Sequence, residues 1–374
     1  MLLLWGQEAG PKRDWPGTKR LATPAEETPV GGGGYRMASN ENEKARGEGV
    51  ASSPELGSLA AGIDHAFTGS ERPGSHVEIP YSGALSFMRR RYSRDFESVD
   101  VVVCGVPCDL TTTNRPGARF GPRGIRTASA QLAMGEHWPW GFDPFLRLAV
   151  VDGGDVVYQP GYVDSMLAAT EAYAARVLEA GASMLTFGGE HLISLPLLRA
   201  HAARYGPVAL VHFDAHSDTW TDEGEVGHGN MFYQALEEGL IDVEHSVHVG
   251  IRTHNAESHG FQLLDADWIQ DQGATEVSRR ICEVVGTARA YLTFDVDCLD
   301  PAFAPGTGTP VVGGLSTRLA RQILRGLTAV DFVGMDVVEV APAYDVAEIT
   351  SLAAATLALD FLCLLAGDKP ERGS

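Results

Sequence analysis

The fold and the chemistry of this chain are decided by Val208-Ala209-Leu210-Val211-His212-Phe213-Asp214-Ala215-His216-Ser217-Asp218, an apolar run of strand length that leads directly into three polar residues. In a straight strand, which rises about 3.3 Å per residue, Asp214 and Asp218 would lie roughly 13 Å apart, too far to share one metal ion at ligand distances of roughly 2 Å. Either the chain curls after Asp214 or the three residues serve more than one metal. A polar turn before a capped helix fits equally well, so the rest of the chain must decide.

The composition is that of a globular protein. The chain has 374 residues, 44% of them hydrophobic, which suffices for one large α/β domain or two small ones. Lys and Arg number 29 against 49 Asp and Glu, giving a formal charge of −20. That charge repels nucleic acid and anionic membranes, so we expect neither as a partner and predict a small cationic or neutral one instead.

Five cysteines are spread through the chain, mostly inside apolar runs. An odd, scattered set predicts buried thiols rather than a disulfide framework, and hence a reducing, cytoplasmic compartment. Cys104 and Cys108 have the spacing of half a zinc site, but no second pair follows. The apolar start at residues 1–5 is too short for a signal peptide, and we expect no run near the roughly 18 apolar residues of a membrane span.

The first 72 residues have the composition of a tail, with four consecutive glycines at 31–34 and a polar run at 40–44. We expect residues 1–72 to be disordered or draped over the surface, and residues 73–374 to form one domain. Glycine codons are GG-rich, as bacterial ribosome-binding sites are, so we hypothesise that translation begins at Met37. A peptide from residues 1–36 in the natively expressed protein, detected by mass spectrometry, would contradict that start.

From about Asp100 the sequence alternates between strand-like and helix-like segments. The strand-like runs cover residues 101–106, 148–151, 183–187, 208–213, 247–251, 290–294 and 332–338. The helical stretches between them cover residues 163–180, 195–204, 276–285, 317–327 and 351–365. Continuous apolar strands suit a sheet that is covered on both faces, so the alternation predicts an α/β fold, a three-layer αβα sandwich with a mostly parallel central sheet. Ligands of such folds bind beyond the carboxyl ends of the strands.

Four of the predicted strands end in polar residues of the kind that bind metals. The strand ends supply His191; Asp214, His216 and Asp218; Asp295 and Asp297; and Glu339. Asp295 and Asp297 share one side of their strand, and two buried carboxylates on one side repel each other unless a positive charge lies between them. Four unrelated polar turns at the expected ligand edge are a much poorer explanation than one site.

The ligand set favours two hard divalent cations. It comprises His191, Asp214, His216, Asp218, Asp295 and Asp297. The set lacks a thiolate and is rich in oxygen, which suits manganese better than structural zinc. Six ligands are too many for one catalytic ion that must keep a position open, whereas two ions roughly 3.5–4 Å apart would ionise a shared water near neutral pH.

Three segments resemble the metal signatures of the arginase/agmatinase (ureohydrolase) family, and within it the bacterial agmatinases. They are Gly188-Gly189-Glu190-His191, Asp214-Ala215-His216-Ser217-Asp218 and Asp295-Val296-Asp297-Cys298-Leu299-Asp300-Pro301. The likeness covers residues 100–365 and extends to residues 301–310, 313–315 and 336–344. It implies a binuclear manganese site, with nickel as the alternative, and hydrolysis of a guanidino group to urea and an amine. It also implies a homo-oligomer, a trimer or hexamer, although a hetero-oligomer remains an alternative.

The resemblance implies roles for individual residues. Asp218 orients the metal-bridging hydroxide and takes its proton, Glu339 grips the guanidinium, and His228 passes a proton to the leaving amine. His228-Gly229-Asn230 lies ten residues past Asp218, within reach of the metals, and Asn230 stands where agmatinases usually have threonine. We therefore expect His228, Asn230 and Glu339 to bind substrate.

Acidic residues near the site indicate the substrate. The loop before His228 contains the acidic residues Asp222, Glu223 and Glu225. They favour a substrate that carries a positive charge at the end away from its guanidino group, as agmatine does, and they would repel the α-carboxylate of arginine. The expected reaction is agmatine plus water to putrescine plus urea. Because of Asn230, another guanidino compound (guanidinobutyrate, guanidine or a biguanide such as metformin) is the alternative. A non-catalytic subunit of a hetero-oligomer is less compatible with a complete ligand set, and a two-metal phosphoesterase would need a basic cluster.

Overall fold

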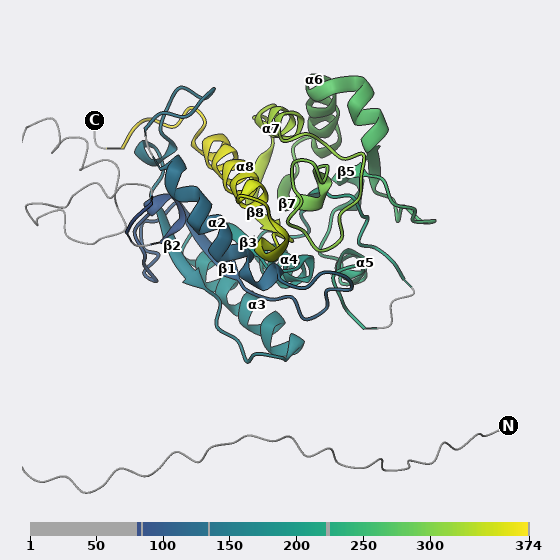
Figure 1. Ribbon diagram of the computed structural model, residues 1–374, viewed down its shortest axis with the longest axis horizontal. Helices are drawn as coiled ribbons and strands as arrows, with labels where there is room; N and C mark the ends of the chain where they lie inside the picture. Colours follow the sequence, from purple (N-terminus) through teal and green to yellow (C-terminus); the bar gives the residue numbers. More distant parts are fainter. Residues whose placement is uncertain (1–80, 84, 134, 222–224, 373–374) are drawn as a thin grey trace, which may run out of the picture. The chain divides into compact units, whose positions relative to one another are not determined.

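The computed structural model describes residues 81–372 except 84, 134 and 222–224. These residues contain an eight-stranded, all-parallel sheet in the order β2-β1-β3-β8-β7-β4-β5-β6 (Figure 1). The strands are β1 Val101–Val106, β2 Val150–Asp155, β3 Ser183–Gly188, β4 Ala209–Phe213, β5 Val247–Ile251, β6 Gln262–Asp265, β7 Arg289–Asp295 and β8 Asp331–Val338. The predicted extension at residues 1–72 and the hypothesised start at Met37 lie outside the described residues.

Helices cover both faces of the sheet, which explains why the strands read as continuous apolar runs. In β1, Val101 and Val103 pack into one core, whereas Val102, Cys104 and Val106 pack into the other. The first core includes helices α2 Gly121–Ser129, α6 Ala266–Val285, α7 Thr317–Arg325 and α8 Ile349–Ala366. The second includes α3 Val163–Glu179, α4 Ser194–Tyr205 and α5 Met231–Glu237. The predicted three-layer αβα sandwich is confirmed.

The sequence prediction missed three short elements and part of a fourth. Strand β6 has four residues at the edge of the sheet, three of them exposed, so it lacks a buried run. Helix α5 has seven residues, too few to show a helical period. Helix α2 has nine residues and begins with Gly121, Pro122 and Gly124, which are typical of a loop. Helix α6 begins ten residues before the predicted start. Gly273, at φ 75°, interrupts its helical backbone, so the segment before this glycine was not predicted as part of the helix.

Helix α8 corrects the expectation that no apolar run reaches the length of a membrane span. Its 18 residues have a mean hydropathy of 2.0, so the helix is long and apolar enough to cross a membrane by length and composition alone. However, 72% of these residues are buried inside the protein. Buried Asp360 in this helix is paired with Arg321 of α7, as expected for a helix in a protein core. The five cysteines are free thiols, as the sequence indicated.

The strand order brings the four polar strand ends together. Strands β3, β8, β7 and β4 are neighbours at the centre of the sheet, although they are not consecutive in the sequence. Phe187, Val337, Phe294 and Phe213 lie opposite one another in register across these strands. The residues that follow them therefore leave the sheet side by side, at the edge where ligands of open α/β sheets bind.

Candidate metal centre

The first group of candidate ligands surrounds one nitrogen of His191. Its Nδ1 lies 3.0 Å from Asp214 Oδ2, 2.9 Å from Asp218 Oδ2 and 3.4 Å from Asp295 Oδ2. This nitrogen is buried and has no hydrogen-bond partner among the described residues, although three carboxylate oxygens surround it. A buried polar atom is normally paired, so this arrangement fits a cation held between the nitrogen and the oxygens.

A second group shares Asp214 with the first. His216 Nδ1 lies 3.3 Å from Asp214 Oδ1 and 3.1 Å from Asp297 Oδ2. Asp214 thus turns one oxygen toward each group, as a carboxylate that bridges two ions would. The donor set of both groups, rich in carboxylates and without thiolate, fits two hard divalent cations.

The chain does curl after Asp214. Asp218 has φ 52°, in the left-handed region, and the turn brings its carboxylate back beside that of Asp214. Asp214 and Asp218 lie within 3.0 Å of the same His191 nitrogen, while Asp214 also lies 3.3 Å from His216. The two aspartates therefore share one group through the curl of the chain, and Asp214 also belongs to the second group. Backbone strain of this kind is common in active sites.

Hydrogen bonds hold His191 in the orientation of a ligand. Its Nε2 lies 2.7 Å from the hydroxyl of Thr293, and that hydroxyl donates to Asp336 Oδ1 at 2.6 Å. Because Thr293 uses its only proton on Asp336, it accepts the Nε2–H of His191. The tautomer assigned from this network leaves the lone pair of Nδ1 facing the carboxylates.

His212, which the sequence analysis did not select, positions the shared carboxylate. Its Nε2 lies 2.8 Å from Asp214 Oδ2, and its Nδ1 lies 2.6 Å from Nδ1 of His248 on β5. Burial lowers the pKa of His212 to about 4, so its ring is neutral. With both nitrogens engaged, His212 orients Asp214 rather than offering a free lone pair to a metal.

Glu339 lies next to the first group with one oxygen unused. Its Oε1 accepts the backbone N–H of His191 at 2.9 Å and lies 3.4 Å from Nδ1 of His228. Its Oε2 is buried without a hydrogen-bond partner among the described residues. A Cβ at Gly308 would come within 3.2 Å of that oxygen, so glycine keeps the space beside it open. An unpaired buried carboxylate oxygen is suited to a cationic ligand.

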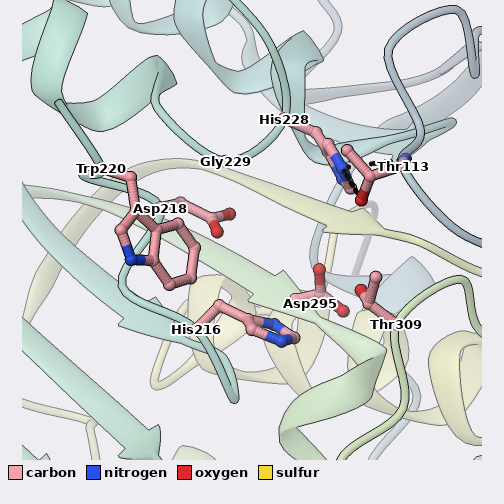
Figure 2. A pocket seen from close by; sticks show the side chains of 8 residues that line it. All are labelled: Thr113, His216, Asp218, Trp220, His228, Gly229, Asp295 and Thr309. Atoms are coloured by element: carbon pink, nitrogen blue, oxygen red, sulfur yellow. Dashed lines mark hydrogen bonds between the residues drawn. The ribbon is translucent and has the colours of Figure 1, made fainter. Parts of the chain in front are cut away.

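The groups open into a cleft of about 450 Å³ (Figure 2). The cleft is lined by Thr113, His216, Asp218, Trp220, His228, Gly229, Asp295 and Thr309. Figure 2 shows His228 against Thr113 on one side, with Asp218 and Trp220 across from them. Of the predicted residues, His216, Asp218, His228 and Asp295 line the cleft. Sequence reasoning missed Thr113, Trp220 and Thr309, since isolated threonines and a tryptophan have no distinctive spacing.

Asn230 is not among the residues that line the cleft. Its Oδ1 accepts the N–H of Gly227 at 2.8 Å, and its Nδ2 donates to the carbonyl of Glu225 at 3.0 Å. The side chain therefore closes its own loop at the start of α5. Asp222 and Glu223, two of the three acidic residues predicted over the site, lie outside the described residues.

Metal binding should stabilise the folded chain. Burial, together with Asp297 and Asp214, raises the pKa of Asp295 well above its usual value, so these carboxylates destabilise one another when no cation is bound. Manganese at about 100 times its Kd should add about 2.7 kcal/mol, or roughly 5–10 °C in Tm. Calorimetry of chelator-treated and manganese-loaded protein measures this shift. A Tm that manganese leaves unchanged, or raises equally in Asp214→Asn, would contradict the site.

Comparison with known proteins agrees with this geometry. The family model described as "Arginase family" matches residues 99–364. An agmatinase of Chromobacterium violaceum is 54% identical over 299 residues, which is 79% of this chain and 93% of that protein. A crystal structure of a hypothetical agmatinase from Burkholderia thailandensis superposes with a TM-score of 0.78 at 54% identity, covering 81% of this chain and 98% of that one.

A more distant solved structure has the same fold. The proclavaminate amidino hydrolase from Streptomyces clavuligerus superposes with a TM-score of 0.73 at 37% identity, covering 77% of this chain and 99% of that one. The family match extends over the four strand ends and both groups of candidate ligands. The resemblance inferred from three short motifs is thus confirmed over most of the sequence, and this chain belongs to the arginase family.

Proposed function

We propose that this chain is an amidinohydrolase that converts agmatine and water to putrescine and urea. The observation that supports this most is the pair of His/Asp groups that share Asp214, with the unpaired Oε2 of Glu339 beside them. The proposal also draws on relatives named agmatinase, which are 51–54% identical to most of the chain.

Membership of the arginase family implies a site for two divalent cations. In this chain, His191, Asp214, Asp218 and Asp295 would bind one cation, and His216, Asp297 and the shared Asp214 would bind the other. By analogy with the family, Asp218 and Asp295 are further candidate ligands of the second cation. We propose manganese as the metal, with nickel as the alternative, because the donors are mostly carboxylate oxygens. When bound, the cations supply the positive charge that ionises water near neutral pH and stabilises the transition state.

The protein residues bind the substrate and move protons. Glu339 Oε2 accepts an N–H of the guanidinium and fixes its plane. Asp218 orients the attacking water and accepts its proton as the new C–O bond forms at the guanidino carbon. His228 donates a proton to the alkyl nitrogen as the C–N bond breaks, releasing the amine and urea. Burial lowers the pKa of His228, but the Glu339 carboxylate raises it to about 9, which favours a proton on Nδ1, the ring nitrogen that faces Glu339. The other ring nitrogen, Nε2, accepts the backbone N–H of Thr113, so the proton to be donated is the one on Nδ1. Bound cations would bring that pKa back toward neutrality.

Asn230 is proposed to act indirectly, by shaping the loop that ends in His228. Its amide is bound to Gly227 and Glu225 of that loop, so it would affect substrate choice through the loop's conformation. The acidic residues of the same loop would favour the cationic end of agmatine.

The substrate is tested by urea release from agmatine, arginine, 4-guanidinobutyrate, guanidine and metformin, each with manganese and with nickel. We expect agmatine with manganese to have the highest kcat/KM. Preference for another compound would overturn agmatine as the substrate. The comparison is worth making because one structurally similar protein is named for a different substrate, proclavaminate. Activity on none of them would favour the alternative of a non-catalytic subunit.

The location, oligomeric state and partners of the protein are proposed from its composition and its family. A cytoplasmic location is consistent with five free thiols. A homo-oligomer, trimeric or hexameric, is proposed by analogy with the family. The net charge of −20 favours a small cationic guanidino substrate over nucleic acid or a membrane surface.

A further inference from the structure

A closed circuit of contacts joins the first ligand group to His228. We call it the Thr111 circuit, and it consists of His191, Glu339, His228, Thr111 and Glu190. Glu339 Oε1 accepts the N–H of His191 at 2.9 Å and lies 3.4 Å from His228 Nδ1. Thr111 Oγ1 accepts the N–H of His228 at 3.1 Å and donates to Glu190 Oε2 at 2.7 Å. Glu190 precedes His191 in the chain, which closes the circuit.

Thr111 is the member that joins the two halves of the circuit. A hydroxyl has one proton to donate and can accept as well, and Thr111 uses both capacities, one on Glu190 and one on His228. Its backbone N–H also donates to Glu190 Oε2 at 2.8 Å. Glu190 is fully buried, so it is a fixed anchor for the loop that follows β1.

The same loop contacts the imidazole of His228 directly. The backbone N–H of Thr113 donates to His228 Nε2 at 3.2 Å, and the Thr113 hydroxyl lies 3.0 Å from that nitrogen (Figure 2). Thr111 fixes the backbone of His228 while Thr113 and Glu339 face its two ring nitrogens. The loop after β1 therefore determines where the ring lies relative to the metal ligands.

We propose that Thr111 is a positioning residue for His228, holding it at a fixed distance from the metal ligands through the Thr111 circuit. The inference deepens the proposed function and rests on it, because the position of His228 matters if His228 delivers a proton to the leaving amine. Thr111 does not touch the ligand groups and does not line the cleft, so its effect on turnover must pass through His228.

The loop supplies a matched set of variants. Thr111→Val keeps the shape but removes both hydroxyl contacts, whereas Thr111→Ser retains them. Thr112→Val is the control, because the Thr112 hydroxyl contacts Glu190 only at 3.4 Å and has no contact with His228. We expect Thr111→Val to lower kcat for agmatine about tenfold with KM changed less than about threefold. Thr111→Ser and Thr112→Val should stay within about twofold of the wild type.

A double-mutant cycle separates positioning from general damage. In the His228→Asn background, Thr111→Val should change kcat less than about twofold, because the residue it positions is gone. A loss of about tenfold in both backgrounds would overturn the inference and leave the proposed function standing. Manganese content and Tm should be the same in the Thr111 and Thr112 variants, which excludes misfolding as the cause.

Chemical labelling tests the circuit without turnover. Diethylpyrocarbonate modifies histidine rings, and peptide mass spectrometry of the manganese-loaded protein follows His228 alone. We expect labelling of His228 to rise about threefold in Thr111→Val and to stay unchanged in Thr112→Val, as a freed ring requires. Equal labelling in the two variants would overturn the inference. If labelling rises but the wild type does not hydrolyse agmatine, the circuit stands and the proposed substrate fails.

Discussion

Replacing Asp218 with asparagine should lower kcat/KM for agmatine by at least about 10³-fold, equivalent to about 4 kcal/mol of transition-state stabilisation. Asp218 lies 2.9 Å from His191 Nδ1 and lines the cleft, so it is close both to the ligand groups and to the space in which we propose that substrate binds. Asparagine has the same shape but no charge, and its NH2 group would oppose a cation. The change removes a ligand charge and the proposed proton acceptor together.

Urea release with saturating manganese measures this loss, and metal analysis of the same samples separates weaker metal binding from impaired proton transfer. Asp265→Asn is the matched control, because Asp265 caps α6 at an exposed position where asparagine caps as well as aspartate. Its activity should equal that of the wild type. Retained turnover in Asp218→Asn would show that the proton acceptor is another group.

Replacing Glu339 with glutamine should lower kcat/KM by about 10²–10⁴-fold, because removing one partner of a buried charge pair costs about 3–5 kcal/mol. Glutamine can still accept the N–H of His191, so the local backbone should be preserved. What is lost is the charge on the unpaired Oε2, which we propose binds the guanidinium. Manganese content should be unchanged, in contrast to the change expected for Asp218→Asn.

Steady-state kinetics across a range of agmatine concentrations measure the Glu339 effect. Glu257→Gln is the control, because the Glu257 side chain is 71% exposed and lies in a loop outside the cleft. A loss smaller than tenfold in Glu339→Gln would mean that the guanidinium binds mainly elsewhere. A loss of manganese from that variant would make Glu339 part of the metal site itself.

The strands and their polar ends could be predicted because both are local patterns. Runs such as residues 101–106 are apolar throughout, and the strand β1 has those bounds in the structure. Asp214, His216 and Asp218 follow a buried strand, and the rule that ligands bind at the carboxyl edge places them without further information. Helix α8 was predicted nearly to its ends, but its full length and hydropathy were underestimated.

The individual hydrogen bonds between distant segments could not be predicted. Thr111 and His228 are 117 residues apart, and His212 and His248 are 36 apart on neighbouring strands. A single threonine in a loop has no periodicity or spacing that indicates a function. Its hydrogen-bond partner depends on which other loop lies beside it in the folded protein. The hydrogen bonds that Asn230, expected to bind substrate, forms with Gly227 and Glu225 of its own loop could not be predicted either.

The sequence by itself determined the layered α/β fold, the edge of the sheet where a site must lie and the residue types that supply its charge. These features follow from apolar runs that must be buried and from the polar residues at the carboxyl ends of the strands. Both are patterns of a few consecutive residues. Only the tertiary structure decided that β8 and β7 lie between β3 and β4, that Asp214 turns an oxygen toward each ligand group and that Thr111 connects Glu190 to His228. Distances of 3 Å between such groups depend on the packing of the whole sheet and its loops, which no local segment of the sequence fixes.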